Sequence, residues 1–293
     1  MFCRPFVNFA VATFLFLSGY LTKIENNNWF AFCKKRIYRV MIPYVIWTAL
    51  YSLRSILSGN SIFIFVYNLA TASATFILYY IFVYIQFVLI TPWLSQLAKS
   101  RFRHLGWLVA PFSIIIFNYI PLITGYELNP YISLLWRDAC LGWFTFYYLG
   151  LLLGNRIIKP DYSLKTLSYS YLISIVLQMA EGYGWLLLGV ANCGSQLKLT
   201  SLLTSTLFLL IAYTLLSKPG FDVKSKILRS LGDYSFGIYL CHIMIKMILT
   251  YLPYYSTIPF PITSFIVLLT SWGCCYCCTK MCGDRISGWL GIK

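Results

Sequence analysis

Charge is scarce in this chain of 293 residues, and negative charge is the scarcest: eight Asp and Glu stand against 23 Lys and Arg, and there are only two His. Charged residues make up 11% of the sequence, whereas hydrophobic residues make up 59% and aromatic residues 19%. A soluble protein could not cover its surface with so few polar side chains. The composition therefore excludes a soluble globular protein and predicts an integral membrane protein.

Hydrophobic stretches recur along the whole chain, most of them near the roughly 20 residues that a helix needs to cross a bilayer. They predict an all-α fold, a polytopic bundle of about nine transmembrane helices. No linker, low-complexity run or long polar block interrupts them, so we expect a single transmembrane domain over residues 1–293. The predicted spans are residues 5–22, 40–57, 76–97, 104–122, 141–155, 167–189, 199–216, 235–252 and 260–279.

Lys and Arg crowd every second gap between these spans. The other gaps hold only Arg4, Arg137 and Lys198, and Arg54 and Lys246 lie inside spans. By the positive-inside rule the crowded gaps face the cytoplasm, which places the N-terminus outside and the C-terminus in the cytoplasm of a multi-pass protein of the cell (inner) membrane. The crowded gaps contain Lys23, Lys34, Lys35, Arg36 and Arg39, then Lys99, Arg101 and Arg103, then Arg156, Lys159 and Lys165, then Lys218, Lys224, Lys226 and Arg229, and finally Lys280, Arg285 and Lys293.

The net charge of +15 does not require a nucleic-acid partner. The cations lie in short loops beside the ends of the spans, where membrane topology and anionic lipid headgroups account for them. We therefore expect the lipid bilayer, and no nucleic acid, as a partner.

The ten cysteines do not form the pattern of a disulfide framework, because five of them lie in or at the edge of hydrophobic spans and the cytoplasmic end of the protein is reducing. These five are Cys241, Cys274, Cys275, Cys277 and Cys278. Small apolar fillers are the simplest interpretation, with metal binding or palmitoylation of the dense cluster as alternatives. A CC-x-CC run on a helix points its thiols in several directions, so we predict no metal site. The cluster consists of Cys274, Cys275, Cys277, Cys278 and Cys282.

Five polar side chains are expected near the middle of the membrane, where a charge costs about 2.5–3.5 kcal/mol unless it is paired or hydrated. His242 and Lys246 are four residues apart and share a helix face, with Tyr239 one turn earlier. One interpretation is that the polar groups hold helices together, with Glu181 pairing with Lys246. The other is a polar pocket in which His242 acts as a general base or acid. The five are Gln86, Gln178, Glu181, His242 and Lys246.

Arg36 and Arg39 lie one helical turn apart in the basic run that precedes Pro43. Two guanidinium groups on one side of a helix suit phosphate, because each forked donor can bind two oxygens. The pair would therefore suit a nucleotide-bearing donor such as a coenzyme A thioester. The alternative is that these cations only set the orientation of the loop.

Several motifs together resemble the acyltransferase-3 family of integral-membrane acyltransferases, which O-acylate cell-surface polysaccharides and related glycans. The resemblance runs along most of the chain, and it depends on the order and spacing of the motifs more than on any one of them. The motifs are Phe16-Leu17-Ser18-Gly19-Tyr20-Leu21; Arg36 and Arg39 leading into Ile42-Pro43-Tyr44-Val45-Ile46-Trp47; Leu78-Tyr79-Tyr80-Ile81 with Gln86 and Pro92; Phe146-Tyr147-Tyr148-Leu149-Gly150; and residues 231–242, which end in Tyr239-Leu240-Cys241-His242.

The resemblance implies about ten helices and an O-acyltransferase that moves an acyl group, acetyl above all, from cytoplasmic acyl-CoA to a hydroxyl of a cell-surface glycan or its lipid-linked precursor. It implies no bound cofactor. Arg36 and Arg39 match the family's Arg-x-x-Arg element, which is associated with the donor. The pocket residues expected beside His242 are Gln86, Glu181, Tyr239 and Lys246.

The sequence departs from the family at one point: the family's presumed catalytic histidine lies in a first helix that has no counterpart here. Neither His104 nor His242 matches that position. Either a further helix precedes the given start, which would restore an even number of spans, or the chain is catalytically impaired. If it is active as given, His242 is the one imidazole expected inside the membrane.

Two other classes of function remain open. A polysaccharide exporter would also place a polar belt at mid-depth, although the sequence shows no evident repeats or paired broken helices. An inactive member of the family that serves as a partner for another membrane protein is the other alternative.

Overall fold

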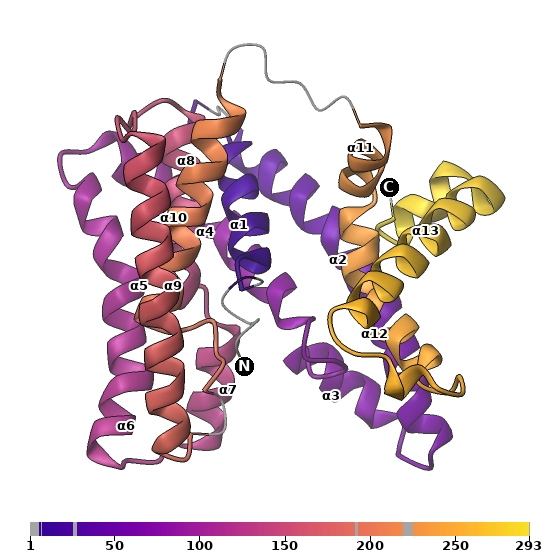
Figure 1. Ribbon diagram of the computed structural model, residues 1–293. Coiled ribbons are helices and arrows are strands. Elements are labelled where there is room, and N and C mark those ends of the chain that lie inside the picture. The colour runs from indigo at the N-terminus through magenta and orange to yellow at the C-terminus, as the bar shows by residue number, and fades with distance from the viewer. Residues whose placement is uncertain (1–5, 7, 26–27, 191–192, 219–224, 293) are drawn as a thin grey trace. The chain divides into compact units, whose positions relative to one another are not determined.

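The computed structural model describes residues 6, 8–25, 28–190, 193–218 and 225–292. Within these ranges the chain forms helices and no strand, which confirms the predicted all-α class. The α-helices, shown in Figure 1, are α1 (Ala10–Tyr20), α2 (Trp29–Leu57), α3 (Phe63–Thr71), α4 (Tyr79–Lys99), α5 (Gly106–Ile114), α6 (Ile120–Thr124), α7 (Pro130–Asp138), α8 (Phe144–Gly154), α9 (Leu164–Leu187), α10 (Leu199–Leu216), α11 (Lys226–Asp233), α12 (Ser235–Leu249) and α13 (Ile262–Trp289).

Every predicted span coincides with a helix, but the lengths differ from the prediction. Among the described residues, five helical segments are long and apolar enough to cross a membrane: Trp29–Leu57, Tyr79–Lys99, Arg103–Thr124, Leu199–Leu216 and Ile262–Trp289. The apolar helices α1 and α12 are shorter, and α8 has only 11 residues. The number of crossings is therefore approximate.

Two differences from the predicted elements have a local cause. Helix α2 begins at Trp29, well before the predicted start at residue 40, because the basic run consists mostly of good helix formers and need not lie in hydrocarbon to be helical. The short helices α3, α7 and α11 lie in gaps between predicted spans. Helices of eight or nine residues are too short to cross a bilayer, so a search for spans does not find them.

The chain forms two compact units, and each consists of two segments of sequence. Unit 1 comprises Met1–Trp29 and Phe82–Phe221, and unit 2 comprises Phe30–Ile81 and Asp222–Lys293. Unit 1 thus contains α1, most of α4, and α5 to α10. Unit 2 contains most of α2 together with α3, α11, α12 and α13.

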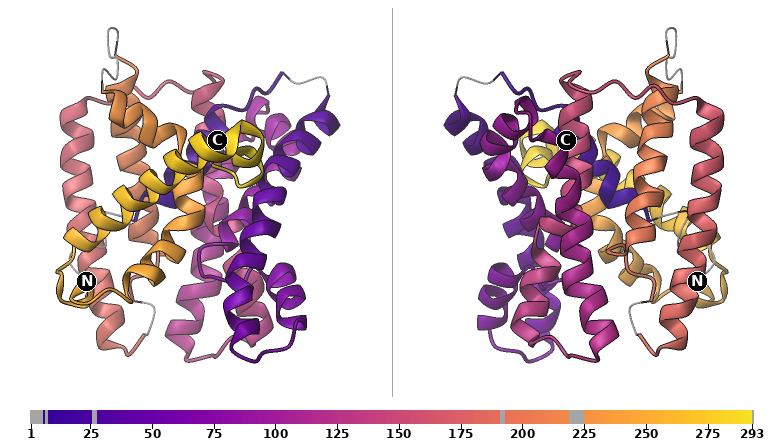
Figure 2. Two further views of the ribbon diagram at one scale, coloured as in Figure 1. Left: turned by 90° about the vertical axis from the view of Figure 1, so that its right-hand side faces the viewer. Right: turned by 90° about the vertical axis from the view of Figure 1, so that its left-hand side faces the viewer.

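Helix α8 is the centre of unit 1, with every residue from Phe144 to Leu153 buried. It packs directly on α1: a Cβ atom added at Gly150 or Gly154 would overlap the backbone of Phe16 or Tyr20. Small residues allow helix backbones to approach this closely in a membrane. Figure 2 shows the helices of this unit from two sides.

Hydrogen bonds between side chains and backbone join the helices of unit 2. The Tyr51 hydroxyl donates to the carbonyl of Leu240 (2.8 Å) and accepts from the amide of Met244 (3.2 Å). The Trp47 indole N–H donates to the carbonyl of Leu290 (3.0 Å). Helix α13 bends at Gly283, which has a left-handed backbone conformation (φ 75°). These hydrogen bonds hold α2 against α12 and against the C-terminal end of α13.

Candidate functional site

His242 lies in the middle of α12, and its ring is half-buried. Its Nδ1 atom is 2.7 Å from the carbonyl oxygen of Tyr239 and 3.2 Å from that of Ile238. Since a carbonyl can only accept a hydrogen bond, this contact assigns the proton of the neutral ring to Nδ1. Nε2 then keeps its lone pair, which is the form that a general base needs.

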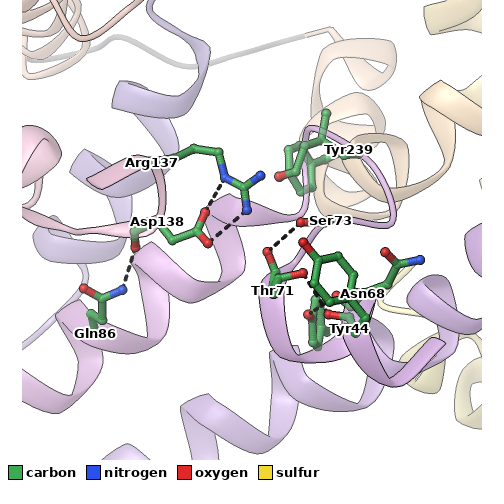
Figure 3. A network of polar contacts seen from close by, with 10 residues as sticks. Tyr44, Asn68, Thr71, Ser73, Gln86, Arg137, Asp138 and Tyr239 are labelled. Atoms are coloured by element: carbon green, nitrogen blue, oxygen red, sulfur yellow. Dashed lines mark hydrogen bonds and ion pairs between the residues drawn. The ribbon is translucent and has the colours of Figure 1, made fainter. Parts of the chain in front are cut away.

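Tyr239 lies beside His242, as the helical spacing predicts. Its hydroxyl donates to the carbonyl of Ile77, and its ring packs edge-on against Tyr80 with 5.4 Å between centroids. The centroids of the Tyr239 and His242 rings are 6.2 Å apart. Tyr239 (Figure 3) therefore ties α12 to the segment before α4 and forms part of the surroundings of His242.

Lys246 lies one turn beyond His242 on α12, but its side chain is exposed. Within the described residues of unit 2, its ammonium group forms no hydrogen bond or ion pair. Unit 2 thus brings His242 and Tyr239 together and leaves the ammonium group of Lys246 at the surface of the chain.

A cavity of about 360 Å³ opens beside α12 in unit 2. Tyr51 and Met247 form part of its wall, and the rest is mostly hydroxyl, amide and guanidinium groups. The signal for this site in the sequence is the cation of Arg54 inside a predicted span. Most of the lining comes from residues 51–75, and Met247 of α12 joins it from far along the chain. The polar lining residues are Arg54, Ser55, Ser58, Asn60 and Thr75.

Gln86 joins two backbone segments of unit 1. Its amide nitrogen donates to the carbonyl of Asp138 (2.6 Å) and its amide oxygen accepts from the N–H of Cys140 (3.1 Å). Asp138 in turn accepts two hydrogen bonds from Arg137, at 2.7 and 2.9 Å (Figure 3). The Gln86 amide thus anchors the C-terminal end of α7, which fits the interpretation that this polar group holds helices together.

Glu181 belongs to a polar cluster of unit 1. Its carboxylate accepts hydrogen bonds from the hydroxyls of Tyr119 and Thr200. One turn earlier, Gln178 donates to Ser201 (2.9 Å). These contacts bind α9 to α10 and to the helix before α6, and the ion pair of Glu181 with Lys246 stays a prediction.

Lys198 is buried just before α10, although the distribution of charge along the sequence predicts that it lies in an outer loop. Its side chain is only 2% exposed, its ammonium donates to the carbonyl of Cys193 (3.0 Å), and it lies 5.4 Å from the centre of the Trp185 ring. In the sequence, a cation beside the start of a predicted span indicates only on which side of the membrane that end of the span lies. Its burial depends on the folding of residues 193–198 back against α9.

Arg36 and Arg39 lie in the N-terminal part of α2, one turn apart as predicted. The guanidinium of Arg36 sits over the ring of Phe32, 4.6 Å from its centre, and the side chain of Arg39 is exposed. The stacking on Phe32 orients the planar guanidinium of Arg36.

The cysteine cluster lies on α13. The Sγ atoms of Cys241 and Cys275 are 3.8 Å apart, and Cys274, Cys277 and Cys282 are exposed. Among the described residues, no group of three or more His, Cys, Asp or Glu side chains is placed to hold a metal ion.

A bundle of apolar helices with buried polar groups defines a polytopic membrane protein. The profile of the acyltransferase-3 family, an acyltransferase domain, matches residues 2–279. The match covers nearly the whole chain and both compact units, so the chain belongs to this family, and the resemblance seen in its motifs is confirmed. No curated protein and no solved structure matches the chain.

Proposed function

We propose that this protein is an O-acyltransferase that moves an acyl group, acetyl above all, from cytoplasmic acyl-CoA to a hydroxyl of a cell-surface glycan or its lipid-linked precursor. The single observation that carries the proposal is the family match over residues 2–279. The protein would work in the cell membrane with its C-terminus in the cytoplasm, as the distribution of Lys and Arg predicts.

Acyl transfer to a hydroxyl needs a base for the hydroxyl proton and a site for each substrate. In this proposal the Nε2 atom of His242 takes the proton of the sugar hydroxyl. The oxygen attacks the thioester carbonyl, and the coenzyme A thiolate leaves and takes up the proton. Tyr239 is a positioning residue, since its bond to Ile77 fixes the turn of α12 that carries His242.

The sugar acceptor would occupy the cavity beside α12. Its hydroxyl and amide lining is the chemistry that recognises carbohydrate, and its volume of about 360 Å³ is near the lower end of the 300–1,000 Å³ of typical small-ligand sites. Arg54 would suit an acidic sugar or a sugar phosphate. Arg36 and Arg39 would bind phosphate oxygens of the donor.

Acyl-ester analysis of the surface glycan tests the proposal in a strain that lacks the gene. We expect the esters to disappear while the amount and length of exported polymer stay normal, and expression of the gene from a plasmid should restore them. Loss of the polymer itself would favour an exporter. Unchanged esters and unchanged polymer would overturn both functions and favour a partner protein without its own activity.

A reaction with purified protein separates the acyl donor from effects in the cell. Protein in lipid vesicles, given acetyl-CoA labelled in its acetyl group and the de-acylated glycan or its lipid-linked precursor, should transfer the label to the glycan in an alkali-sensitive ester. Hydrolysis of acetyl-CoA without any transfer to glycan would contradict the proposed acceptor.

A further inference from the structure

The largest cavity that we describe lies in unit 1 and has a volume of about 790 Å³. It opens where α1, α4, α8 and α10 end, and its wall includes Lys23, Lys99 and Arg156 together with the rings of Tyr20 and Tyr213. The three cations come from three separate basic gaps of the sequence. The fold therefore brings the three cations together around one cavity. The sequence alone predicts only that they lie on the same side of the membrane.

A second cavity of about 290 Å³ adjoins the first, because both are lined by Ile24, Glu25 and Lys99. Its other walls are Trp29 and residues of the last turns of α4, among them Gln96. The larger cavity is therefore lined by basic side chains, and the smaller one is lined by the indole ring of Trp29 and the side-chain amide of Gln96.

The frame of the larger cavity is held by Asn155. Its side-chain oxygen accepts from the N–H of Ile24 (3.0 Å), and its amide nitrogen donates to the carbonyls of Thr22 and Leu151 (2.8 Å each). Gly154 packs on the backbone of Tyr20 so closely that no Cβ atom would fit. The segments that carry Lys23 and Arg156 are thus fixed to each other.

Arg156 adopts a left-handed backbone conformation, with φ at 56°. This conformation is unfavourable for a residue with a Cβ atom, and such residues cluster at ligand sites. Here it turns the chain at the end of α8, on the wall of the cavity.

Lys23, Lys99 and Arg156 have no hydrogen-bonding or ion-pair partner among the described residues of the protein. Their side chains are exposed. Glu25 is the one acidic residue among the lining residues. Holding three positive side chains around one cavity with a single carboxylate leaves net positive charge there, and a phosphate-bearing ligand would neutralise it.

The simpler explanation is that these cations only mark the cytoplasmic side and favour helix C-termini. A cation near a helix C-terminus interacts favourably with the helix dipole. The last carbonyls of α8, however, already accept hydrogen bonds from the backbone N–H groups of Asn155, Arg156 and Ile157. Hydrogen bonds between these cations and a phosphate group would be charge-assisted, which makes them stronger than hydrogen bonds between neutral groups.

We propose that this cavity binds the phosphate groups of the nucleotide part of the acyl donor. The pyrophosphate and the ribose phosphate of coenzyme A would contact Lys23, Lys99 and Arg156, and the base would stack on Trp29 in the adjoining cavity. This inference rests on the proposed use of acyl-CoA, and it concerns residues of unit 1 alone. An anionic lipid headgroup shares the phosphate chemistry, and the test separates the two sources.

Binding of coenzyme A without an acyl group tests the site independently of turnover. Full-length protein in nanodiscs of phosphatidylcholine, which has no net charge, is titrated calorimetrically with coenzyme A and with adenosine 3′,5′-bisphosphate. We expect both to bind, and we expect Lys23→Gln with Lys99→Gln, and separately Arg156→Asn, to weaken each Kd at least about tenfold, which is 1.4 kcal/mol. Asn is chosen at position 156 because it tolerates a left-handed backbone.

Lys159→Gln and Lys165→Gln are the matched controls. They remove the same charge from the gap that contains Arg156, but neither residue lines either cavity, so their Kd values should stay within about twofold of the wild type. An equal loss in the controls would mean that general surface charge attracts the nucleotide, and it would overturn the site. Lys23 and Lys99 are exposed, so the glutamine variants keep the fold available for the measurement.

The remaining outcomes separate this inference from the proposed function. Unchanged coenzyme A affinity in the cavity variants, with loss of phosphatidylglycerol bound to the protein in native mass spectra, would assign the cavity to lipid headgroups and overturn the donor site. Acyl transfer with unaltered donor affinity in the same variants would overturn this inference alone. Nucleotide binding that depends on the three cations, without acyl transfer, would support the cavity and contradict the proposed reaction.

Discussion

His242 is the residue on which the proposed chemistry depends. The contact of its Nδ1 atom with the backbone carbonyl of Tyr239 leaves Nε2 as the free base. We predict that His242→Gln lowers kcat for acyl transfer by about 10²- to 10⁴-fold, because glutamine cannot take up the hydroxyl proton. His104→Gln is the matched control, since His104 is exposed in the short 3-10 helix Arg103–Leu105 that precedes α5.

The measurement for His242 is the rate of labelled acetyl transfer at saturating acetyl-CoA, together with its pH profile. In the wild type the rate should fall as the pH drops and His242 becomes protonated, and the variant should lose this dependence. A variant with normal kcat would show that another group takes the proton.

Arg36 and Arg39 are predicted to act on the donor alone. Arg36→Ala or Arg39→Ala should raise the KM for acetyl-CoA about ten- to a hundredfold, the loss expected for a charge-assisted hydrogen bond of about 1.5–3 kcal/mol. Steady-state kinetics with varied acetyl-CoA give the KM. Lys35→Ala in the same basic run should leave it unchanged, and unaltered donor kinetics in both arginine variants would contradict their assignment.

Gln86 illustrates a polar residue whose main contribution is to stability. Gln86→Leu removes the partners of the Asp138 carbonyl and the Cys140 N–H. An unsatisfied buried group costs about 1–3 kcal/mol, so we predict a thermal midpoint several degrees below the wild type. Thermal unfolding of the detergent-solubilised protein measures it. Gln96→Leu, at an exposed position of the same helix, should unfold close to the wild-type temperature.

At the scale of secondary-structure elements, the packing of α1 against α8 organises unit 1. Helix α8 has only 11 residues, so a search for long apolar helices does not find it. It is nevertheless buried from Phe144 to Leu153, and its glycines Gly150 and Gly154 lie against the backbone of α1. The sequence contains these glycines in motifs of mostly aromatic and aliphatic residues. Which helix they face depends on a partner more than a hundred residues away.

We predict that Gly150→Ala separates α1 from α8 and strongly destabilises the protein. The new Cβ atom would overlap the backbone oxygen of Phe16, and backbone cannot move aside as a flexible side chain can. Overpacking of this kind costs about 1–3 kcal/mol or more. The yield of monodisperse protein and its thermal midpoint measure the effect.

Gly184→Ala is the control for this substitution, because it lies in α9 with open space around the added methyl group. It should leave the midpoint unchanged or raise it slightly, since alanine favours helix over glycine. Equal behaviour of the two variants would contradict the close approach of α1 and α8.

At the scale of the whole molecule, the distribution of positive charge predicts how the chain crosses the membrane. An epitope tag inserted after Ser58, in the loop that follows α2, should bind antibody on intact cells. A tag at the C-terminus should bind only after the membrane is permeabilised. The reverse pattern would contradict the orientation, and with it the assignment of Lys23, Lys99 and Arg156 to the cytoplasmic side.

The family match covers both compact units of the molecule. Each unit is assembled from two separate segments of sequence. His242, Tyr239 and the arginine pair belong to unit 2, whereas Gln86, Glu181 and the basic cavity belong to unit 1.

The sequence by itself determined the helical class, the apolar stretches and the family. In hydrocarbon every backbone polar group must be satisfied within its own segment, so a run of apolar residues is enough to predict a helix. The sequence did not predict the early start of α2 or the short helices α3, α7 and α11. A search for apolar runs of about 20 residues finds neither a basic helical segment nor a helix of eight or nine residues.

Only the tertiary structure decided what the polar residues do. It bonded Gln86 to two backbone groups, buried Lys198 against α9, and gathered Lys23, Lys99 and Arg156 around one cavity. These outcomes depend on the rotation of each helix about its axis and on neighbours far away in the sequence. Hydrophobic periodicity and charge counts give neither the rotation of a helix nor its distant neighbours. The sequence therefore predicts only the membrane side of these cations, and the fold shows that they line a candidate binding site.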